Sequence, residues 1–177
     1  MRCINRAIQR KKTWLAAISI ILFFLLLSEK LPVPKIFVYN RTASLPVGWY
    51  LILPSQNYQL GDIVVFQAPE KAKELAIQRG WFSEGELMMK QIGALENMSY
   101  RIDENGQFYV EKTYMGQTAI ADRYNRPMPQ LRGTFTVGPG TFLPVSKNPN
   151  SFDGRYYGSV SLKNIRYKVV PFLTTWQ

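Results

Sequence analysis

The chain of 177 residues contains no histidine and only one cysteine, Cys3. Without histidine, a Ser-His-Asp triad is impossible. A single cysteine cannot form an intramolecular disulfide, and it has no histidine partner for a cysteine–histidine metal site. The G-x-S-x-G, S-x-x-K, P-loop and G-x-G-x-x-G motifs are also missing. We therefore expect no metal and no cofactor, and any serine nucleophile must use a base other than imidazole.

Acidic residues are missing from the first 28 positions, while five of the first 12 residues are Arg or Lys. The net charge of the whole chain is +10, from 22 basic and 12 acidic residues. Beyond position 28 the remaining 17 basic residues are mixed with all 12 acidic ones, without long runs. Half of the excess positive charge thus lies in a short N-terminal tail, which favours binding to a membrane surface over binding to nucleic acid. We expect no nucleic-acid partner.

Residues 13–28 (TWLAAISIILFFLLLS) carry no charge. As a helix they would be about 24 Å long, which approaches the thickness of a bilayer core. The alternative is a cleavable signal peptide, but the following SEKLPVPKIF has no small-x-small cleavage site. We therefore predict a transmembrane signal anchor at 13–28. The basic residues before it predict a cytoplasmic tail at 1–12 and an extracytoplasmic domain at 29–177.

Downstream of the predicted anchor the sequence is typical of β structure, with one helix. Asn105-Gly106 favours a type I′ turn in a hairpin over 100–110. Short apolar or alternating runs bounded by turn residues predict the other strands, at 36–39, 49–53, 63–66, 87–95, 135–137, 141–145 and 160–170. Residues 71–79 (KAKELAIQR), ended by Gly80, predict the helix. The expected fold class is mainly β, with antiparallel sheet.

Two residues could supply hydrolytic chemistry without histidine. Ser44 lies in the segment RTASLPVGWY, and a neutral lysine amine can activate a serine hydroxyl once burial lowers its pKa. Lys90 suits that role because its neighbours Leu87, Met88, Met89 and Ile92 are apolar. Taken alone, however, a serine before Leu-Pro is usually a turn residue, and a lysine in an apolar strand is usually an edge residue. The residues by themselves leave both interpretations open.

Four segments occur in a distinctive order: Ser44 in T-x-S-L-P-x-G-x-Y, GDIVVFQAPE at 61–70, Lys90 in MMKQIGAL, and NSFDGRYYGSV at 150–160. Behind an N-terminal anchor, this order resembles the bacterial signal peptidase I family. The S-L-P-x-G-x-Y version of the first segment is similar to the TraF-type conjugative transfer peptidases. The resemblance covers about residues 13–173, and it implies a coiled antiparallel β-sheet domain with an apolar surface that associates with the membrane.

The resemblance also implies roles for individual residues. Ser44 corresponds to the nucleophile, Lys90 to its general base, and Thr42 to a hydroxyl that shares the oxyanion hole with the Ser44 backbone N–H. In the last segment Ser151 corresponds to a serine that hydrogen-bonds the lysine amine. Asp153 and Arg155 correspond to a charged pair that supports the site.

Three departures from the general secretory enzymes indicate a specialised peptidase with few substrates. Gly154 stands where those enzymes commonly have serine, QIGALEN after Lys90 lacks their fuller glycine and aspartate pattern, and proline follows Ser44 by two positions instead of three. We therefore predict a serine endopeptidase in the bacterial inner membrane, with a single span and a periplasmic catalytic domain. Its expected partners are the lipid bilayer and an exported precursor such as a conjugative pilin or transfer protein. A non-catalytic assembly subunit of a conjugation or secretion apparatus is the alternative.

Overall fold

The computed structural model describes Trp14, residues 18–20 and residues 35–175. The chain divides into two units between Lys35 and Ile36, and the described residues of the first unit before Lys35 are helical. Within the described ranges no helix is long and apolar enough to cross a membrane. The predicted tail at 1–12 and much of the predicted anchor at 13–28 lie outside the described residues, so both stay predictions.

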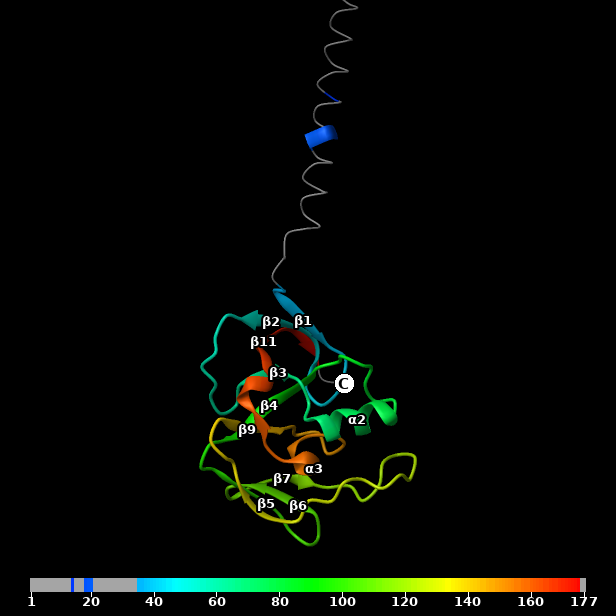
Figure 1. The fold of residues 1–177 in the computed structure, drawn as a ribbon, viewed down its shortest axis with the longest axis vertical. Coiled ribbons are helices and arrows are strands. Elements are labelled where there is room, and N and C mark those ends of the chain that lie inside the picture. The colour runs from blue at the N-terminus through cyan, green and yellow to red at the C-terminus, as the bar shows by residue number, and fades with distance from the viewer. Residues whose placement is uncertain (1–13, 15–17, 21–34, 176–177) are drawn as a thin grey trace, which may run out of the picture. The chain divides into compact units, whose positions relative to one another are not determined.

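The second unit is built around a large antiparallel sheet of seven strands (Figure 1). The strand order is β1-β2-β11-β3-β4-β9-β10. The bounds are β1 (Phe37–Asn40), β2 (Val47–Leu53), β3 (Ile63–Phe66), β4 (Met88–Leu95), β9 (Thr141–Val145), β10 (Val160–Ser161) and β11 (Ile165–Thr175). The last strand of the chain, β11, inserts between β2 and β3, whereas β1 lies at the edge of the sheet.

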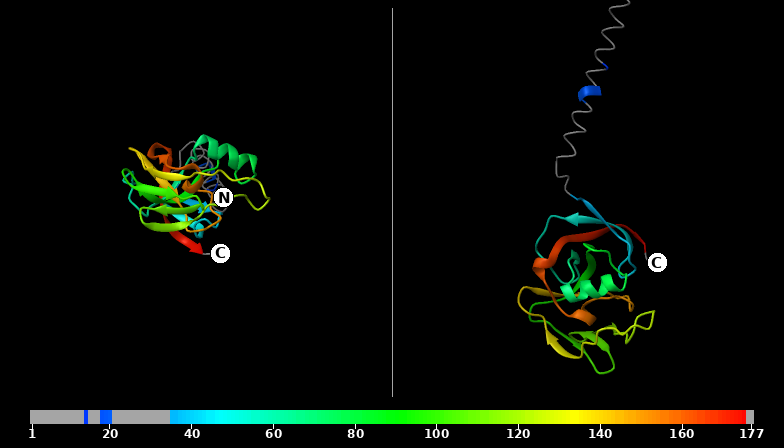
Figure 2. Two further views of the ribbon diagram at one scale, coloured as in Figure 1. Left: turned by 90° about the horizontal axis from the view of Figure 1, so that it is seen from below. Right: turned by 45° about the vertical axis from the view of Figure 1, so that its right-hand side comes forward.

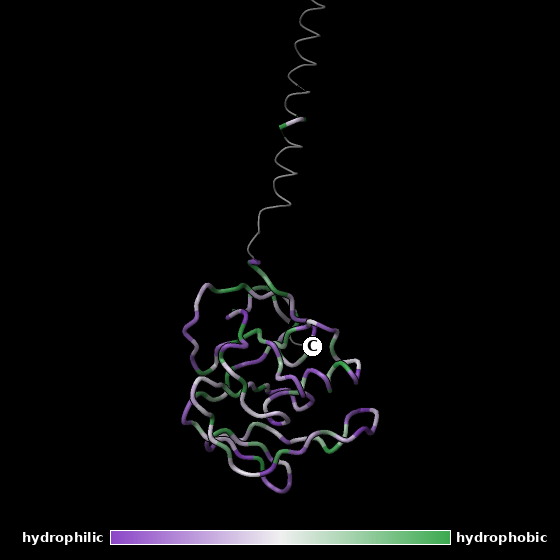
Figure 3. Tube along the Cα trace, viewed as in Figure 1, coloured by the Kyte–Doolittle hydropathy of each residue, from purple (hydrophilic) through white to green (hydrophobic). Residues whose placement is uncertain are grey.

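A smaller antiparallel sheet of four strands follows β4 in the chain, in the order β7-β6-β5-β8 (Figures 1 and 2). Its strands are β5 (Ser99–Ile102), β6 (Gln107–Val110), β7 (Thr113–Gln117) and β8 (Gly133–Thr136). The helices are α2 (Glu70–Gln78), the single turn α3 (Gly154–Tyr157) and the 3₁₀ turn η1 (Leu162–Asn164). In Figure 3 the strands carry most of the apolar residues, and the projecting loops are mostly hydrophilic.

Buried apolar side chains hold the two sheets together. Ala94 of β4 and Leu143 and Val145 of β9 belong to the same core cluster as side chains of β5 and β6. A second cluster packs between the large sheet and α2, and a third lies under the strands next to the Ser44 loop. Strand β4 therefore contributes to all three clusters and β9 to two of them, which fixes the position of Lys90 in the fold.

The mainly β, antiparallel fold class predicted from the sequence is confirmed, as are the helix and most strands up to shifts at their ends. The single strand predicted at 160–170 is wrong, because the turn η1 divides it into β10 and β11. The predicted type I′ turn is wrong, because Gly106 has a positive φ (79°) and Asn105 does not. Instead, Gly106 N donates to Asp103 O at 2.9 Å, and the Asp103 carboxylate accepts from the N–H of Asn105 and Gln107. An aspartate that satisfies its own turn in this way favours a type I turn followed by a left-handed glycine. Strand β7 and helix α3 were not predicted.

One face of β1, β2 and β11 exposes large apolar side chains. Phe37 contacts Phe172 with ring centroids 5.2 Å apart, and Tyr39 contacts Trp49 at 5.1 Å. Val170 and Leu173 continue this face, because they pair in register with β2 residues Leu51 and Trp49. We call this surface the outer apolar face and define it by Phe37, Tyr39, Trp49, Val170, Phe172 and Leu173. Apolar patches of this kind are a feature of surfaces that bind a partner or a membrane.

Candidate active site

Ser44 lies in the loop between β1 and β2 and is 8% exposed. The loop enters β2 through Leu45, which packs in the core beside Tyr50 and Val65. Gly48 then adopts φ 140°, and a Cβ at this position would lie 2.1 Å from the Leu173 carbonyl oxygen. The glycine of the S-L-P-x-G segment is thus required by the close approach of β11. These constraints hold the serine at a fixed point on the edge of the core.

The carbonyl groups around Ser44 are all held by hydrogen bonds. The Asn40 amide, in a side chain that is 5% exposed, donates to the carbonyl oxygens of Thr42, Leu45 and Pro46 at 2.9–3.1 Å. The remaining donors come from the segment after β9: Ser146 Oγ to the Ser44 carbonyl and Asn148 Nδ2 to the Ala43 carbonyl, the latter at 2.9 Å. A loop with this many anchored carbonyls has little freedom to rearrange.

The hydroxyl of Ser44 lies 3.1 Å from that of Thr42. Thr42 Oγ1 also donates to Asn40 Oδ1 at 3.1 Å. Because a threonine hydroxyl has one proton, Thr42 accepts from Ser44 whenever it donates to Asn40. The Thr42 hydroxyl must therefore turn away from Asn40 before it can donate to a negatively charged oxygen.

Lys90 lies in the middle of the large sheet, on β4. It pairs with Val64 of β3, and its neighbour Gln91 pairs with Val145 of β9. Because the strands are antiparallel, the same register continued past the end of β9 leads from Lys90 to Ser146, the residue that follows β9. Ser146 also donates to the Ser44 carbonyl, so one residue links the lysine strand to the serine loop. Among the hydrogen bonds of residues 35–175, none joins Ser44 Oγ to the Lys90 amine.

Burial lowers the pKa of the Lys90 amine to about 8. The side chain is 7% exposed and shares a strand face with Met88 and Ile92, which are 2% and 1% exposed. The Asp153 carboxylate opposes this effect, and the Arg155 guanidinium adds to it. Desolvation has the larger effect on the Lys90 pKa because it acts on the ammonium charge directly, whereas the charge of Asp153 is largely balanced by Arg155. At a pH of about 8, half of the Lys90 amines are neutral and able to accept a proton.

A pH profile follows from this value. If Lys90 acts as a base, kcat should rise about tenfold per unit below the pKa of about 8 and level off above it. The sign follows from the chemistry, because only the unprotonated amine accepts a proton. Single-turnover rates between pH 6 and 10 would measure the profile, with and without a chelator. A flat profile, or a loss of activity in the chelator, would contradict this role.

Asp153 and Arg155 form a completely buried ion pair. Arg155 Nε and Nη2 donate to the two carboxylate oxygens at 2.8 and 3.1 Å, and Nη2 also donates to the Ser146 carbonyl at 2.8 Å. Asp153 caps α3 by accepting from the Arg155 N–H, and it accepts from the Ser146 N–H at 3.0 Å. Burial raises the pKa of Asp153, and the Arg155 guanidinium counteracts that rise. The pair therefore holds the backbone of Ser146, whose hydroxyl bonds to the Ser44 carbonyl.

Gly154 is required between the two charged residues. A Cβ at this position would lie 2.7 Å from both Leu143 Cδ1 and the Pro144 carbonyl oxygen. Helix α3 thus packs against β9 more closely than any side chain at position 154 would allow. This contact gives a physical reason for glycine at position 154, where the general secretory enzymes commonly have serine.

The structure places Ser151 near the site but without the predicted hydrogen bond. Ser151 is 4% exposed, and its Oγ has no hydrogen-bond partner within the part of the chain that the structure describes. The bond from Ser151 to the Lys90 amine is therefore not formed in this arrangement. A buried hydroxyl without a partner is unfavourable, which leaves Ser151 Oγ available to a neighbouring polar group.

Of the six residues selected from the sequence, the structure joins Thr42 to Ser44 and Asp153 to Arg155, and the charges of the second pair act on the Lys90 amine. Sequence reasoning missed Asn40, Ser146 and Asn148, which hold the serine loop. Asn40 could have been found from the sequence, because it is the polar residue that ends the otherwise apolar run IFVYN at 36–40. Nothing local marked Ser146 or Asn148, because their partners lie 102 and 105 residues away.

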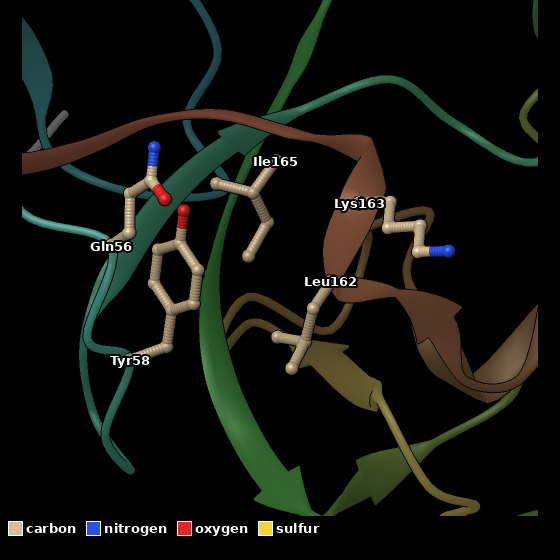
Figure 4. Close-up of a pocket in the computed structure, with 5 residues that line it drawn as sticks. All are labelled: Gln56, Tyr58, Leu162, Lys163 and Ile165. Carbon is tan, nitrogen blue, oxygen red and sulfur yellow. The ribbon is translucent and has the colours of Figure 1, made fainter.

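No cluster of potential metal ligands occurs within the described residues. An open cavity of about 470 Å³ lies elsewhere, between the segment after β2 and the start of β11 (Figure 4). It is lined by Gln56, Tyr58, Leu162, Lys163 and Ile165. None of the candidate residues contributes to it, so its size does not make it the candidate site.

Known proteins are similar to this chain over most of its length. Two proteins of Escherichia coli, both named plasmid transfer protein TraF, are 29% identical over 145 residues and 32% identical over 146 residues. Each alignment covers 76% of this chain and 81% of the relative. A signal peptidase I from Enterococcus faecalis is similar in structure with a TM-score of 0.40 and 17% identity, over 64% of this chain and 97% of its own. Residues 10–173 match the family described as signal peptidase, peptidase S26. The chain therefore belongs to the signal peptidase family, peptidase S26, and is related to TraF.

Proposed function

We propose that the protein is a membrane-anchored serine endopeptidase that removes the leader of an exported precursor, with Ser44 as nucleophile and Lys90 as general base. The observation that carries the proposal is the buried Lys90 amine, whose pKa is lowered to about 8, on the strand joined through Ser146 to the Ser44 loop. Membership of a peptidase family supports the reaction class.

The reaction needs no group from outside the chain except water. Neutral Lys90 accepts the Ser44 proton as Oγ attacks the scissile carbonyl, and the oxyanion receives hydrogen bonds from the Ser44 N–H and the Thr42 hydroxyl. The protonated amine then gives its proton to the leaving amine, and the C–N bond breaks. Water, deprotonated by Lys90, attacks the acyl-enzyme and releases the second product with Ser44 restored.

The proposed substrate is a conjugative pilin or another transfer protein exported with a leader. The support is that the relatives bear the name plasmid transfer protein. In this proposal the domain lies on the periplasmic side of the inner membrane, and the outer apolar face contacts the lipid that holds the leader. A non-catalytic assembly subunit remains the second candidate, but a scaffold gives no reason to bury a lysine beside a serine loop.

Mass spectrometry of a co-expressed candidate precursor would test this function. With the wild-type protein the precursor should lose its N-terminal leader at one bond, and without the protein it should stay intact. An intact precursor in the presence of protein, together with normal assembly of the transfer apparatus, would support the scaffold instead. A product lighter than the linear mature chain by one water would indicate cyclisation.

Thr42 provides a separate test of the oxyanion arrangement. Thr42→Ala should lower kcat about 10²–10³-fold and leave KM nearly unchanged, because one oxyanion donor is worth that much. Thr42→Ser keeps the hydroxyl and should be milder. Steady-state kinetics on the purified protein would separate the two parameters. A change confined to KM would make Thr42 a substrate-contact residue.

The proposed membrane topology can be tested by fusions after Gln177. A reporter active only outside the cytoplasm should be active there, since the basic tail at 1–12 favours the cytoplasmic side. A reporter that functions only in the cytoplasm should be inactive in the matched fusion. The reverse pattern would contradict both the location and the cleavage of exported leaders.

A further inference from the structure

The two peptide groups that flank Ser44 are held by one short segment, residues 146–148. Asn148 Nδ2 donates to the Ala43 carbonyl at 2.9 Å, and Ser146 Oγ donates to the Ser44 carbonyl. The segment also supports itself, because Asn148 N donates to Ser146 Oγ at 3.0 Å. Both carbonyls are more than 100 positions distant in the chain from their donors, so these contacts exist only in the folded protein.

Holding the Ala43 carbonyl orients the N–H of the next residue. The described residues contain no cis peptide bonds, and in a trans peptide the C=O and the following N–H point in opposite directions. The Ser44 N–H is therefore directed away from Asn148. None of the hydrogen bonds formed by residues 35–175 uses this N–H, so it is free to bind an oxygen of a substrate.

The segment is itself anchored on the buried ion pair. Ser146 is 1% exposed, its N–H donates to Asp153 Oδ2 at 3.0 Å, and its carbonyl accepts from Arg155 Nη2 at 2.8 Å. Its hydroxyl is left to point toward the serine loop. The backbone of Ser146 is thus held in the protein interior, and the Ser146 side chain fixes the Ser44 carbonyl relative to that interior.

We propose that Asn148 and Ser146 are positioning residues, which hold the peptide groups on either side of Ser44 so that its N–H faces the oxyanion of the acyl-transfer step. This inference rests on the proposed peptidase function. The two residues touch no reacting atom and act through the backbone of Ala43 and Ser44. Their effect is expected in the transition state, because an oxyanion donor must be in place before charge develops on the substrate oxygen.

Asn148→Asp is the most informative variant. A carboxylate keeps the oxygen that accepts the Asn150 N–H at 2.8 Å but cannot donate to the Ala43 carbonyl. We expect kcat to fall about 10- to 100-fold with little change in KM, since a misplaced oxyanion donor loses part of its usual value. Asn148→Ala should lose a similar factor. Rates should be compared on the high-pH plateau, because a new carboxylate raises the pKa of nearby amines.

Lys147→Ala is the matched control, because Lys147 is exposed and lies between the two positioning residues. It should leave kcat unchanged. Ser146→Ala should reduce kcat at least as much as Asn148→Asp, since the lost donor is the buried one. Wild-type kcat in Asn148→Asp, in an enzyme shown to be active, would overturn the proposal.

A second measurement does not depend on catalysis. Hydrogen–deuterium exchange of the full-length protein in detergent reports the amides of residues 41–48. Loss of the Asn148 donor should increase exchange at Thr42, whose N–H is bonded to Asn40 Oδ1 at 3.2 Å, and at the start of β2. Increased exchange in a protein that cleaves no precursor would retain the anchoring of the Ser44 loop by Asn148 and reject the peptidase function. Unchanged exchange in Asn148→Asp would overturn the positioning role.

Discussion

Ser44→Ala and Lys90→Ala should each abolish leader removal, with kcat lower by a factor on the order of 10⁴–10⁶. Alanine at 44 removes the proposed attacking oxygen, and alanine at 90 removes the amine whose pKa is lowered to about 8. Processing of a co-expressed precursor, followed by mass spectrometry, measures the loss. Both variants should remain folded, since within the described residues neither side chain donates to a backbone group.

The double variant distinguishes a catalytic unit from two independent residues. If Ser44 and Lys90 act together, the double alanine variant should be little worse than either single one, because each change already stops the same step. Multiplicative losses would instead indicate that Lys90 supports the structure. Alanine at Lys73, which pairs with Glu70 on the surface, is a suitable lysine control and should leave processing unchanged.

Lys90→Arg separates the charge of the side chain from its basicity. Arginine keeps a positive group of similar length, but its guanidinium stays protonated and cannot accept the Ser44 proton. The variant should be as inactive as Lys90→Ala. An active arginine enzyme would exclude proton transfer to residue 90.

The second large effect is expected from the buried ion pair. Arg155→Met should destabilise the domain by about 3–5 kcal/mol, because it leaves the Asp153 carboxylate buried without its partner. Both side chains are 0% exposed, so water cannot replace the lost contacts. For a domain of this size the change lowers the melting temperature by roughly 10 °C or more. Thermal unfolding of the full-length protein in detergent would measure it.

Two comparisons make this prediction specific. Lys73→Ala disrupts the exposed pair with Glu70 and should barely change the melting temperature, because surface pairs contribute little. A double variant, Asp153→Leu with Arg155→Met, removes both charges and should recover part of the loss. Recovery should be incomplete, since Asp153 also caps α3 and accepts the Ser146 N–H. An Arg155→Met protein as stable as Lys73→Ala would show that the pair is not a structural support.

Local patterns in the sequence were enough for the helix α2 and for most of the strands, whereas the roles of Ser44 and Lys90 came from the resemblance to a family and stay a prediction. Alternating or continuous apolar runs determine strand position through burial, and the absence of histidine restricts the choice of base. The burial of Lys90 was also predictable, since Met88, Met89 and Ile92 surround it in the sequence. The type of the hairpin turn was not, because the Asp103 carboxylate outweighs the preference of Asn105-Gly106.

Tertiary structure alone decided how the serine loop is joined to the segment after β9. The sequence contains Ser146 and Asn148 as ordinary polar residues, and only the register of β4 with β9 brings them to Lys90 and to the carbonyls around Ser44. The physical reason is that hydrophobic burial is encoded by neighbours along the chain. The direction of a buried hydrogen bond, by contrast, depends on partners that meet only after the sheets have packed.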